Sequence, residues 1–176
     1  MSENPNLTLV LGGARSGKSA YAEGLIEKYP APWTYIATAQ AFDAEMSARI
    51  AAHRDRRGAG WTTIEAAQEL ARAILGAPAD RAMLVDCLTL WLSNRLLAGA
   101  DLSAERVQLV AALRGRAAPT VIVSSEVGLS IVPENPLARA FRDAAGELHQ
   151  EVARISGRVA LTVAGYPLTV KDETRR

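Results

Sequence analysis

Short apolar runs alternate with longer amphipathic stretches along the chain. The runs are rich in β-branched residues and bounded by turn residues, which predicts strands. They are Leu7–Leu11, Trp33–Ala37, Ala82–Asp86, Thr120–Ser124 and Arg158–Ala164, with a shorter one at Thr62–Glu65. Apolar spacing predicts helices near residues 19–28, 43–57, 66–76, 88–98, 103–114 and 136–155, with Asp43 as N-cap of the second. Continuously apolar strands alternating with helices indicate an α/β fold, a mostly parallel central sheet with helices on both faces.

The composition limits the number of domains, the binding partners and the location of the protein, and it does not change the predicted fold. A length of 176 residues predicts one domain, residues 1–176. The formal net charge of +1 gives no general electrostatic case for binding nucleic acid or an anionic membrane. A single cysteine, Cys87, excludes an internal disulfide and fits a reducing compartment. The sequence contains no secretory signal and no apolar stretch near the ~20 residues of a membrane span, so we expect a cytoplasmic protein.

The segment GGARSGKS, after the first predicted strand, is the clearest motif. It matches G-x-x-x-x-G-K-[ST] between a strand and a helix, where backbone N–H groups can surround a phosphate. Lys18 is expected to reach the β- and γ-phosphates, and Ser19 to hold Mg²⁺. The alternative, a chance glycine-rich turn, is disfavoured by the strand–loop–helix context. The predicted phosphate-binding residues are Gly12, Gly13, Ala14, Arg15, Ser16, Gly17, Lys18 and Ser19.

An acidic residue ends a later apolar strand. Asp86 follows "AMLV", at the carboxyl edge where open α/β sheets bind ligands, and is expected to help hold Mg²⁺. The alternative is a strand-end aspartate that caps the next helix. Together with the glycine-rich segment, Asp86 predicts Mg-nucleotide binding, but it does not specify the reaction.

One of the two histidines lies among arginines in "SARIAAHRDRR". Neighbouring cations oppose protonation of His53, and a neutral imidazole is a nucleophile or a base. An arginine cluster binds phosphate. The alternative is a histidine on a solvated basic helix, and these residues alone do not decide between the two.

The stretch "SSEVGLSIVPENPLARAFRD" combines a strand end, a long loop and the start of a helix. Glu126, Arg139 and Arg142 around this loop would suit a substrate-binding lip, because loops on a rigid scaffold often carry function. A helix cap with surface arginines explains the same residues equally well.

From about Leu7 to Lys171 the chain closely resembles the bifunctional adenosylcobinamide kinase/adenosylcobinamide-phosphate guanylyltransferase family of cobalamin biosynthesis. The resemblance rests on GGARSGKS, on YIATAQAFDAEMSARIAAHR, on W-T-x-x-E at Trp61–Glu65, and on EVGLSIVPENPLARAFRD. The second and fourth segments are far more specific than the phosphate-binding motif. The resemblance implies a P-loop NTPase fold and a homotrimer.

The resemblance also implies two reactions. ATP or GTP phosphorylates the aminopropanol hydroxyl of adenosylcobinamide, and GMP from GTP is then transferred to that phosphate through a guanylyl-histidine, giving adenosylcobinamide-GDP. The family's reacting histidine corresponds to His53, with Lys18 as the other catalytic residue. The remaining nucleotide contacts that it implies are Ala37, Thr38, Ala39, Arg54, Asp55, Arg56, Arg57, Glu65 and Asp86.

Three positions depart from the family pattern. Ser125 stands where members often have asparagine, Ser130 where they often have glycine, and His149 where they often have asparagine. These departures concern corrinoid contact, and we interpret His149 as structural or peripheral. Two other functions remain open: a guanylyltransferase without kinase activity, and a regulatory P-loop switch. A simple switch has no use for the His–Arg cluster.

Overall fold

A computed structural model describes residues 3–40 and 57–174. The helix predicted near 43–57 lies outside these residues except for its last residue, and its N-cap Asp43 and His53 also lie outside them. The strands are β1 (Asn4–Gly12), β2 (Trp33–Ala37), β3 (Trp61–Glu65), β4 (Met83–Asp86), β5 (Thr120–Ser125), β6 (Ser156–Val163) and β7 (Tyr166–Asp172). The helices are α1 (Lys18–Ile26), α3 (Leu70–Gly76), α4 (Leu88–Leu97), α5 (Leu102–Arg114) and α6 (Pro136–Ile155).

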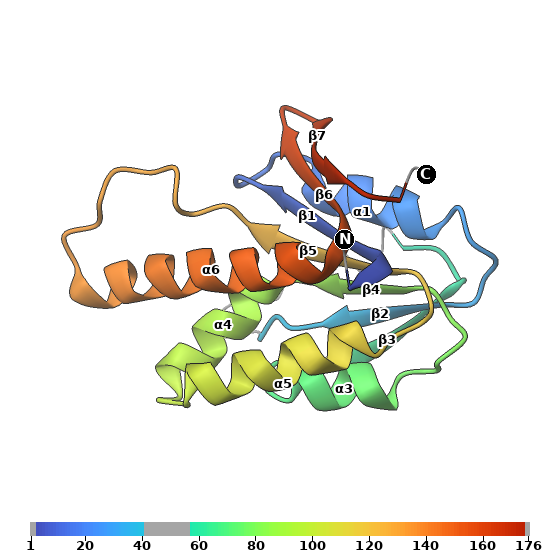
Figure 1. Cartoon of the computed structure of the whole chain (residues 1–176), viewed down its shortest axis with the longest axis horizontal. Helices are drawn as coiled ribbons and strands as arrows, with labels where there is room; N and C mark the ends of the chain where they lie inside the picture. The colour runs from blue at the N-terminus through green and yellow to red at the C-terminus, as the bar shows by residue number, and fades with distance from the viewer. Residues whose placement is uncertain (1–2, 41–56, 175–176) are drawn as a thin grey trace.

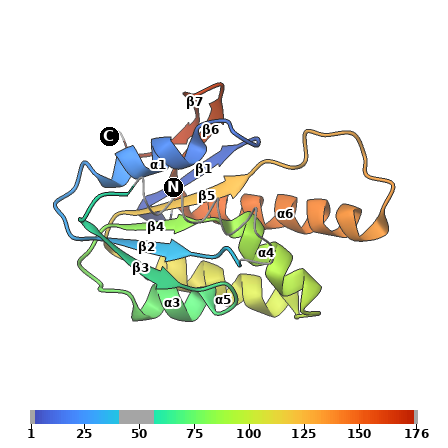
Figure 2. The same ribbon diagram turned by 180° about the vertical axis from the view of Figure 1, so that it is seen from behind.

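The described strands form one sheet in the order β3-β2-β4-β5-β1-β6-β7. Neighbouring strands are parallel except β6 and β7, which are antiparallel. Helix α1 covers one face, and α3 to α6 cover the other (Figure 1, and from behind in Figure 2). The predicted mostly parallel α/β sheet with helices on both faces is confirmed.

Alternate strand residues face the two helical layers. In β1, Leu7 and Leu9 pack with α3 to α6, whereas Val10 packs with α1. In β4, Val85 likewise packs with α3 to α6, and Leu84 packs with α1. Because both faces are buried, the central strands are apolar along their whole length, which made them recognisable in the sequence.

Several predicted boundaries differ from the structure, and two of the differences have clear local reasons. The helix predicted at 66–76 begins only at Leu70, because the Ala66 N–H donates to the Ala37 carbonyl (2.7 Å) and continues the strand pairing. The strand predicted at Arg158–Ala164 ends at Val163, because Ala164 and Gly165 adopt positive φ angles of 50° and 86°. This turn leads into β7, an edge strand that the sequence did not predict.

The parallel strands bring the predicted site residues to one edge of the sheet. Gly12 pairs with Ser125, Asp86 with Val123, and Ala37 with both Asp86 and Glu65. β5 therefore lies between the strand that precedes the glycine-rich loop and the strand that carries Asp86. In the part of the chain that the structure describes, no helix is long and apolar enough to cross a membrane.

Candidate functional site

The loop from Gly12 to Lys18 curls tightly between β1 and α1. Arg15 and Gly17 have positive φ angles of 54° and 89°, and the Ser16 N–H donates to the Gly13 carbonyl (3.3 Å). When residues with left-handed and right-handed backbone conformations alternate, successive N–H groups point toward one centre and form a concavity that binds anions. Gly17 is the N-cap of α1 and supplies no side-chain acceptor. The N–H groups of the first helical turn are thus left for an anion.

The turn between β6 and β7 supports this loop from behind. The Gly165 N–H donates to the Ser16 carbonyl (2.9 Å), and a Cβ on Gly17 would lie 3.1 Å from Gly165 Cα. A Cβ on Gly12 would lie 2.4 Å from Ser16 Oγ and 2.8 Å from the Thr162 carbonyl. Larger residues would displace the backbone, so these glycines are needed for close packing as well as for backbone conformation.

Lys18 extends back across the loop. Its Nζ donates to the Gly13 carbonyl (3.0 Å), and the side chain is partly exposed. An ammonium group has three donors, so two remain for a phosphate held by the loop. Ser19 follows in the first turn of α1 and is also partly exposed. The glycine-rich segment therefore forms a strand–loop–helix unit whose geometry suits a bound phosphate, and we call it the phosphate cradle.

Asp86 lies at the end of β4 and accepts a hydrogen bond from the Tyr35 hydroxyl (3.2 Å). The N-cap of α4 is Cys87, so the alternative interpretation of Asp86 as a helix cap is wrong. Burial, and next the charge of Asp86, raise the pKa of Tyr35, which keeps its hydroxyl protonated as a donor. Tyr35, which the sequence analysis missed inside an apolar run, therefore orients the carboxylate.

The donor chemistry suits Mg²⁺. Ser19 offers a hydroxyl and Asp86 a carboxylate, and Mg²⁺ prefers oxygen ligands. Within residues 3–40 and 57–174 no group of three or more His, Cys, Asp or Glu side chains could hold a metal. An ion at Ser19 and Asp86 would therefore complete its coordination with nucleotide phosphates and water, as Mg²⁺ commonly does.

Arg57 lies over the face of Tyr35, with its guanidinium carbon 3.4 Å from the ring centroid. Tyr35 also packs edge-on against Trp61, at 6.1 Å between centroids. Residue 57 is in a bend, so the predicted helix does not extend to it. Stacking on Tyr35 places the only described member of the arginine cluster beside the tyrosine that contacts Asp86. The predicted residues His53, Arg54, Asp55 and Arg56 lie outside the described part of the chain.

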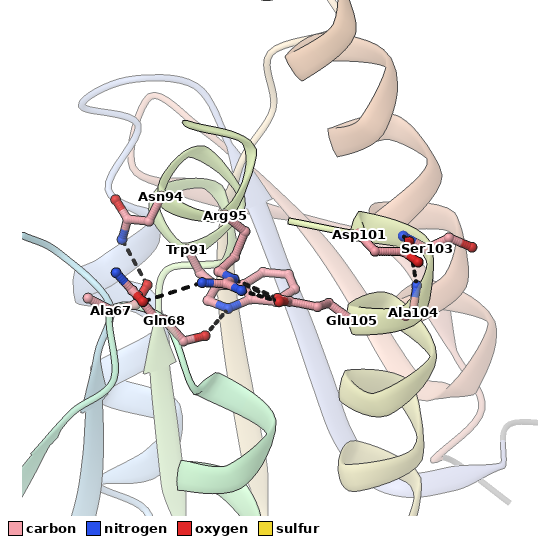
Figure 3. A network of polar contacts seen from close by, with 9 residues as sticks. All are labelled: Ala67, Gln68, Trp91, Asn94, Arg95, Asp101, Ser103, Ala104 and Glu105. Atoms are coloured by element: carbon pink, nitrogen blue, oxygen red, sulfur yellow. Dashed lines mark hydrogen bonds and ion pairs between the residues drawn. The ribbon is translucent and has the colours of Figure 1, made fainter. Parts of the chain in front are cut away.

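Thr38 is fully buried and joins two strand ends. Its hydroxyl donates to the Cys87 carbonyl (2.7 Å) and accepts the Cys87 N–H (2.8 Å). Asn94 Nδ2 donates to the Thr38 carbonyl (2.9 Å). It also donates to the Ala67 carbonyl (2.9 Å), as Figure 3 shows. The Thr38 side chain is thus fully engaged inside the protein, and it holds the neighbouring Ala37 and Ala39 in place.

The loop that follows Glu65 is fixed from α4 and α5. Trp91 Nε1 donates to the Gln68 carbonyl (2.8 Å), and Arg95 pairs with Glu105 through its guanidinium (Figure 3). Glu65 itself is exposed, beside a surface hollow of about 460 Å³ lined by residues 64–69 and by Arg72, Ala73 and Gly76. The arrangement presents one carboxylate on a rigid base. The sequence indicated this support of the loop only weakly, because Asn94, which binds the loop through the Ala67 carbonyl, lies among apolar helix residues.

Glu126 lies beside the cradle. Its N–H donates to the Gly12 carbonyl (3.0 Å), and its Oε1 accepts the Gly128 N–H (2.6 Å). The alternative of a helix cap in this stretch is confirmed for Asn135, whose side chain accepts the Leu137 and Ala138 N–H groups, but Glu126 is not part of that cap. Glu126 therefore joins the edge that carries the phosphate cradle and Asp86.

The two arginines predicted beside Glu126 are engaged elsewhere. Arg139 donates to the Pro133 carbonyl (2.9 Å), and Arg142 pairs with Asp143 (2.9 Å). Along α6, at 1.5 Å per residue, they lie roughly 10–15 Å before His149, the α6 residue that faces Glu126. The structure does not bring these arginines to Glu126.

His149 was interpreted as structural or peripheral, and it is buried against the end of β5. Its Nε2 lies 2.7 Å from Ser124 Oγ, and its Nδ1 lies 3.7 Å from Glu126 Oε2. Burial lowers the pKa of His149, and the charge of Glu126 partly opposes this. The structural interpretation is confirmed, but the contact with Glu126 means that His149 is not peripheral.

Comparison with known proteins identifies close relatives. Residues 8–170 match the family model described as cobinamide kinase / cobinamide phosphate guanyltransferase. The bifunctional adenosylcobalamin biosynthesis protein CobP of Pseudomonas aeruginosa is 48% identical, covering 94% of this chain and 97% of that protein. The corresponding CobU proteins of Salmonella typhimurium and Escherichia coli are 42% and 39% identical, each covering 94% of this chain and 99% of the relative.

Solved structures of distant sequence share the fold. The flagellar accessory protein FlaH of Methanocaldococcus jannaschii has a TM-score of 0.56 at 11% identity, covering 96% of this chain and 79% of that one. A Pyrococcus horikoshii protein has a TM-score of 0.52 at 8% identity, covering 98% and 93%. Identities this low show the fold alone. Together with the phosphate cradle, they confirm the predicted P-loop NTPase fold.

Proposed function

Because this chain belongs to the cobinamide kinase / cobinamide phosphate guanyltransferase family, we propose that it catalyses both reactions at one nucleotide site. It phosphorylates the aminopropanol hydroxyl of adenosylcobinamide with ATP or GTP. It then transfers GMP from GTP to that phosphate, giving adenosylcobinamide-GDP for cobalamin biosynthesis. The observation that carries this proposal is the phosphate cradle within a family match that spans residues 8–170. We propose that residues 1–176 act as one catalytic domain.

In the kinase reaction the cradle binds the β- and γ-phosphates of the donor. The N–H groups at the start of α1 and the amine of Lys18 neutralise the charge of the transferred group. Ser19 and Asp86 would hold Mg²⁺, which neutralises phosphate charge when bound. The Tyr35 hydroxyl keeps the Asp86 carboxylate in place, as its hydrogen bond supports.

In the guanylyl transfer the neutral imidazole of His53 attacks the α-phosphorus of GTP. A nitrogen–phosphorus bond forms, the bond to the β-phosphate oxygen breaks, and pyrophosphate leaves into the same cradle. The corrinoid phosphate then takes GMP from the histidine. The stack of Arg57 on Tyr35 supports a phosphate-binding role for Arg57. Arg54 and Arg56 are proposed to bind phosphate as well, and Asp55 is proposed as a further contact to the nucleotide.

The guanine of GTP is proposed to lie at the ends of β2 and β3. A carboxylate accepts hydrogen bonds from the N–H groups of guanine. Glu65 is exposed on the loop that α4 and α5 hold in place, beside an open surface hollow, and this position suits a carboxylate that binds guanine. Ala37 and Ala39 would contact the base directly. Thr38 would act indirectly, because its hydroxyl joins the end of β2 to Cys87 at the end of β4.

We further propose a cytoplasmic homotrimer. Apolar side chains along the β6–β7 hairpin are exposed, including Tyr166 (80%) and Leu168 (61%), and a partner subunit would cover them. Cys87 is an unpaired, buried thiol, which fits a reducing compartment. Glu126, Arg139 and Arg142 are assigned to the corrinoid side, with the two arginines at the outer end of α6.

The test uses purified chain with adenosylcobinamide and two labels. Transfer of label from γ-labelled ATP to the corrinoid reports the kinase, and label from α-labelled GTP on protein and then corrinoid reports guanylyl transfer. His53→Ala should abolish the protein-bound GMP and its transfer while phosphorylation persists, because phosphoryl transfer needs no nucleophilic imidazole. The protein-bound label should be acid-labile and stable to base.

Each other outcome identifies another function. Guanylyl transfer without phosphorylation would indicate a guanylyltransferase alone. Slow GTP hydrolysis with neither transfer would indicate a regulatory switch. Label retained on the His53→Ala variant would refute His53 as the carrier.

A further inference from the structure

A series of polar side chains leads from the interior of the protein to the phosphate cradle. Thr89 Oγ1 lies 2.9 Å from Ser124 Oγ, which lies 2.7 Å from His149 Nε2. The other ring nitrogen, Nδ1, faces Glu126 Oε2 at 3.7 Å. Ser124 and His149 are buried, whereas 22% of the Glu126 side chain is exposed. The series therefore ends in a carboxylate that a ligand can reach.

The groups around His149 indicate which nitrogen carries the proton. Nδ1 faces the Glu126 carboxylate, which only accepts hydrogen bonds, so the proton of the neutral imidazole belongs on Nδ1. Nε2 is then the acceptor of the Ser124 hydroxyl, and Ser124 Oγ in turn lies beside Thr89 Oγ1, which accepts the Ser125 N–H (2.6 Å). Nδ1–H is the positive end of the ring dipole, and it faces the Glu126 carboxylate.

Glu126 is held from two further directions. Its N–H donates to the carbonyl of Gly12, the first residue of the phosphate cradle, at 3.0 Å. Its Oε1 accepts the Gly128 N–H at 2.6 Å. Because β5 lies between β1 and β4, the residue stands between the cradle and Asp86. An acceptor that approaches a γ-phosphate in the cradle would meet this edge of the sheet.

Phosphorylation of an alcohol needs a destination for one proton. The hydroxyl oxygen forms a bond to the γ-phosphorus, the bond between that phosphorus and the bridging oxygen breaks, and its electron pair leaves with the nucleoside diphosphate. Lys18 is a cation and cannot take the hydroxyl proton. Asp86 accepts a hydrogen bond from Tyr35 and is the proposed metal ligand. A further carboxylate at this edge of the sheet, free of the metal, would provide an acceptor.

Resting on the proposed kinase activity, we propose that Glu126 accepts this proton and that His149 is a positioning residue that holds the Glu126 carboxylate through Nδ1–H. Ser124 holds the opposite nitrogen of the ring, and Thr89 contacts Ser124 from behind. This assignment separates the two reactions: Glu126 serves phosphoryl transfer, and His53 serves guanylyl transfer. It also gives His149 a part in the chemistry without contact with substrate.

The test measures both reactions on the whole chain with adenosylcobinamide, ATP and GTP. Glu126→Gln keeps the shape of the side chain and should lower kcat for phosphorylation by about 10²–10⁴-fold, the usual contribution of a general base. Its KM for ATP and its covalent loading with GMP should stay near wild type, because the cradle is intact. Glu134→Gln, which removes a carboxylate from the same loop, is the matched control and should leave both reactions unchanged.

The positioning role is tested at residue 149. His149→Asn places an amide N–H where Nδ1 stood, facing Glu126, although its shorter side chain does not reach Ser124, so it should retain most of the phosphorylation rate. His149→Ala has no donor at this position and should lose roughly 10–100-fold in kcat with unchanged KM for ATP, because the base is misplaced while binding is not. Equal effects of the two substitutions would overturn the positioning role.

Failure of this inference is distinguishable from failure of the proposed function. If the wild-type chain phosphorylates adenosylcobinamide and Glu126→Gln does so within about threefold of its kcat, Glu126 is not the base and the kinase assignment stands. If Glu126→Gln loses phosphorylation and GMP loading equally, Glu126 supports nucleotide binding and the inference is wrong. If the wild-type chain phosphorylates nothing, the kinase activity itself is refuted and Glu126 has no such role.

Discussion

Removal of the Asn94 side chain should destabilise the end of the sheet that carries Thr38 and Glu65. Its Nδ2 carries two N–H donors, and these bind two backbone carbonyls from different strand ends, each at 2.9 Å. Asn94→Ala leaves both carbonyls without this donor. No apolar neighbour can replace it.

The size of the effect follows from the burial of the two carbonyls. Thr38 is fully buried, so its orphaned carbonyl should cost about 1–3 kcal/mol. Ala67 is partly exposed and water can reach it, so its lost hydrogen bond should cost only about 0.5–1.5 kcal/mol. The sum predicts a loss of about 1.5–4.5 kcal/mol in the free energy of unfolding, or roughly 3–18 °C in Tm.

Urea unfolding at an unchanged m-value is the appropriate assay. Gln108→Ala, on the exposed side of α5, removes a side-chain amide of the same chemistry and should change stability by no more than about 0.5 kcal/mol. A loss below about 0.5 kcal/mol for Asn94→Ala would refute the reasoning, because it would mean that water satisfies the Thr38 carbonyl as well as the side chain does.

Two further predictions concern groups at the end of β4. Asp86→Asn should lower both transfer rates while the fold survives, and raised Mg²⁺ should recover part of the loss; an unchanged Mg²⁺ dependence would remove Asp86 from the metal site. Cys87 should resist iodoacetamide at pH 8 in the folded protein and react after unfolding, because burial, with Asp86 adding to it, raises its pKa to about 11 and leaves roughly one thiolate in a thousand. Rapid alkylation of the native chain, followed by mass spectrometry, would contradict the buried position of the thiol.

The central strands were predictable because burial on both faces produces continuous apolar runs. Strand β7 was not, because it is an edge strand with an exposed face and contains Pro167. The phosphate cradle and Asp86 could be recognised because motif spacing and a strand-end position carry their chemistry locally. Tyr35, Asn94 and His149 could not, because each acquires its role only from a partner that the fold brings to it. The pairing of His149 with Glu126 depends on α6 returning antiparallel beside β5 (Figure 1).

The central claim is that one phosphate cradle serves both group transfers, and Lys18→Ala tests it most directly. The wild-type and variant chains would be assayed separately for transfer of label from γ-labelled ATP to adenosylcobinamide and for covalent loading from α-labelled GTP. The account predicts that both are lost together while the fold is retained, because the same amine neutralises the transferred phosphate in one reaction and the leaving pyrophosphate in the other. Either reaction persisting at a near wild-type rate would contradict the claim of a shared site.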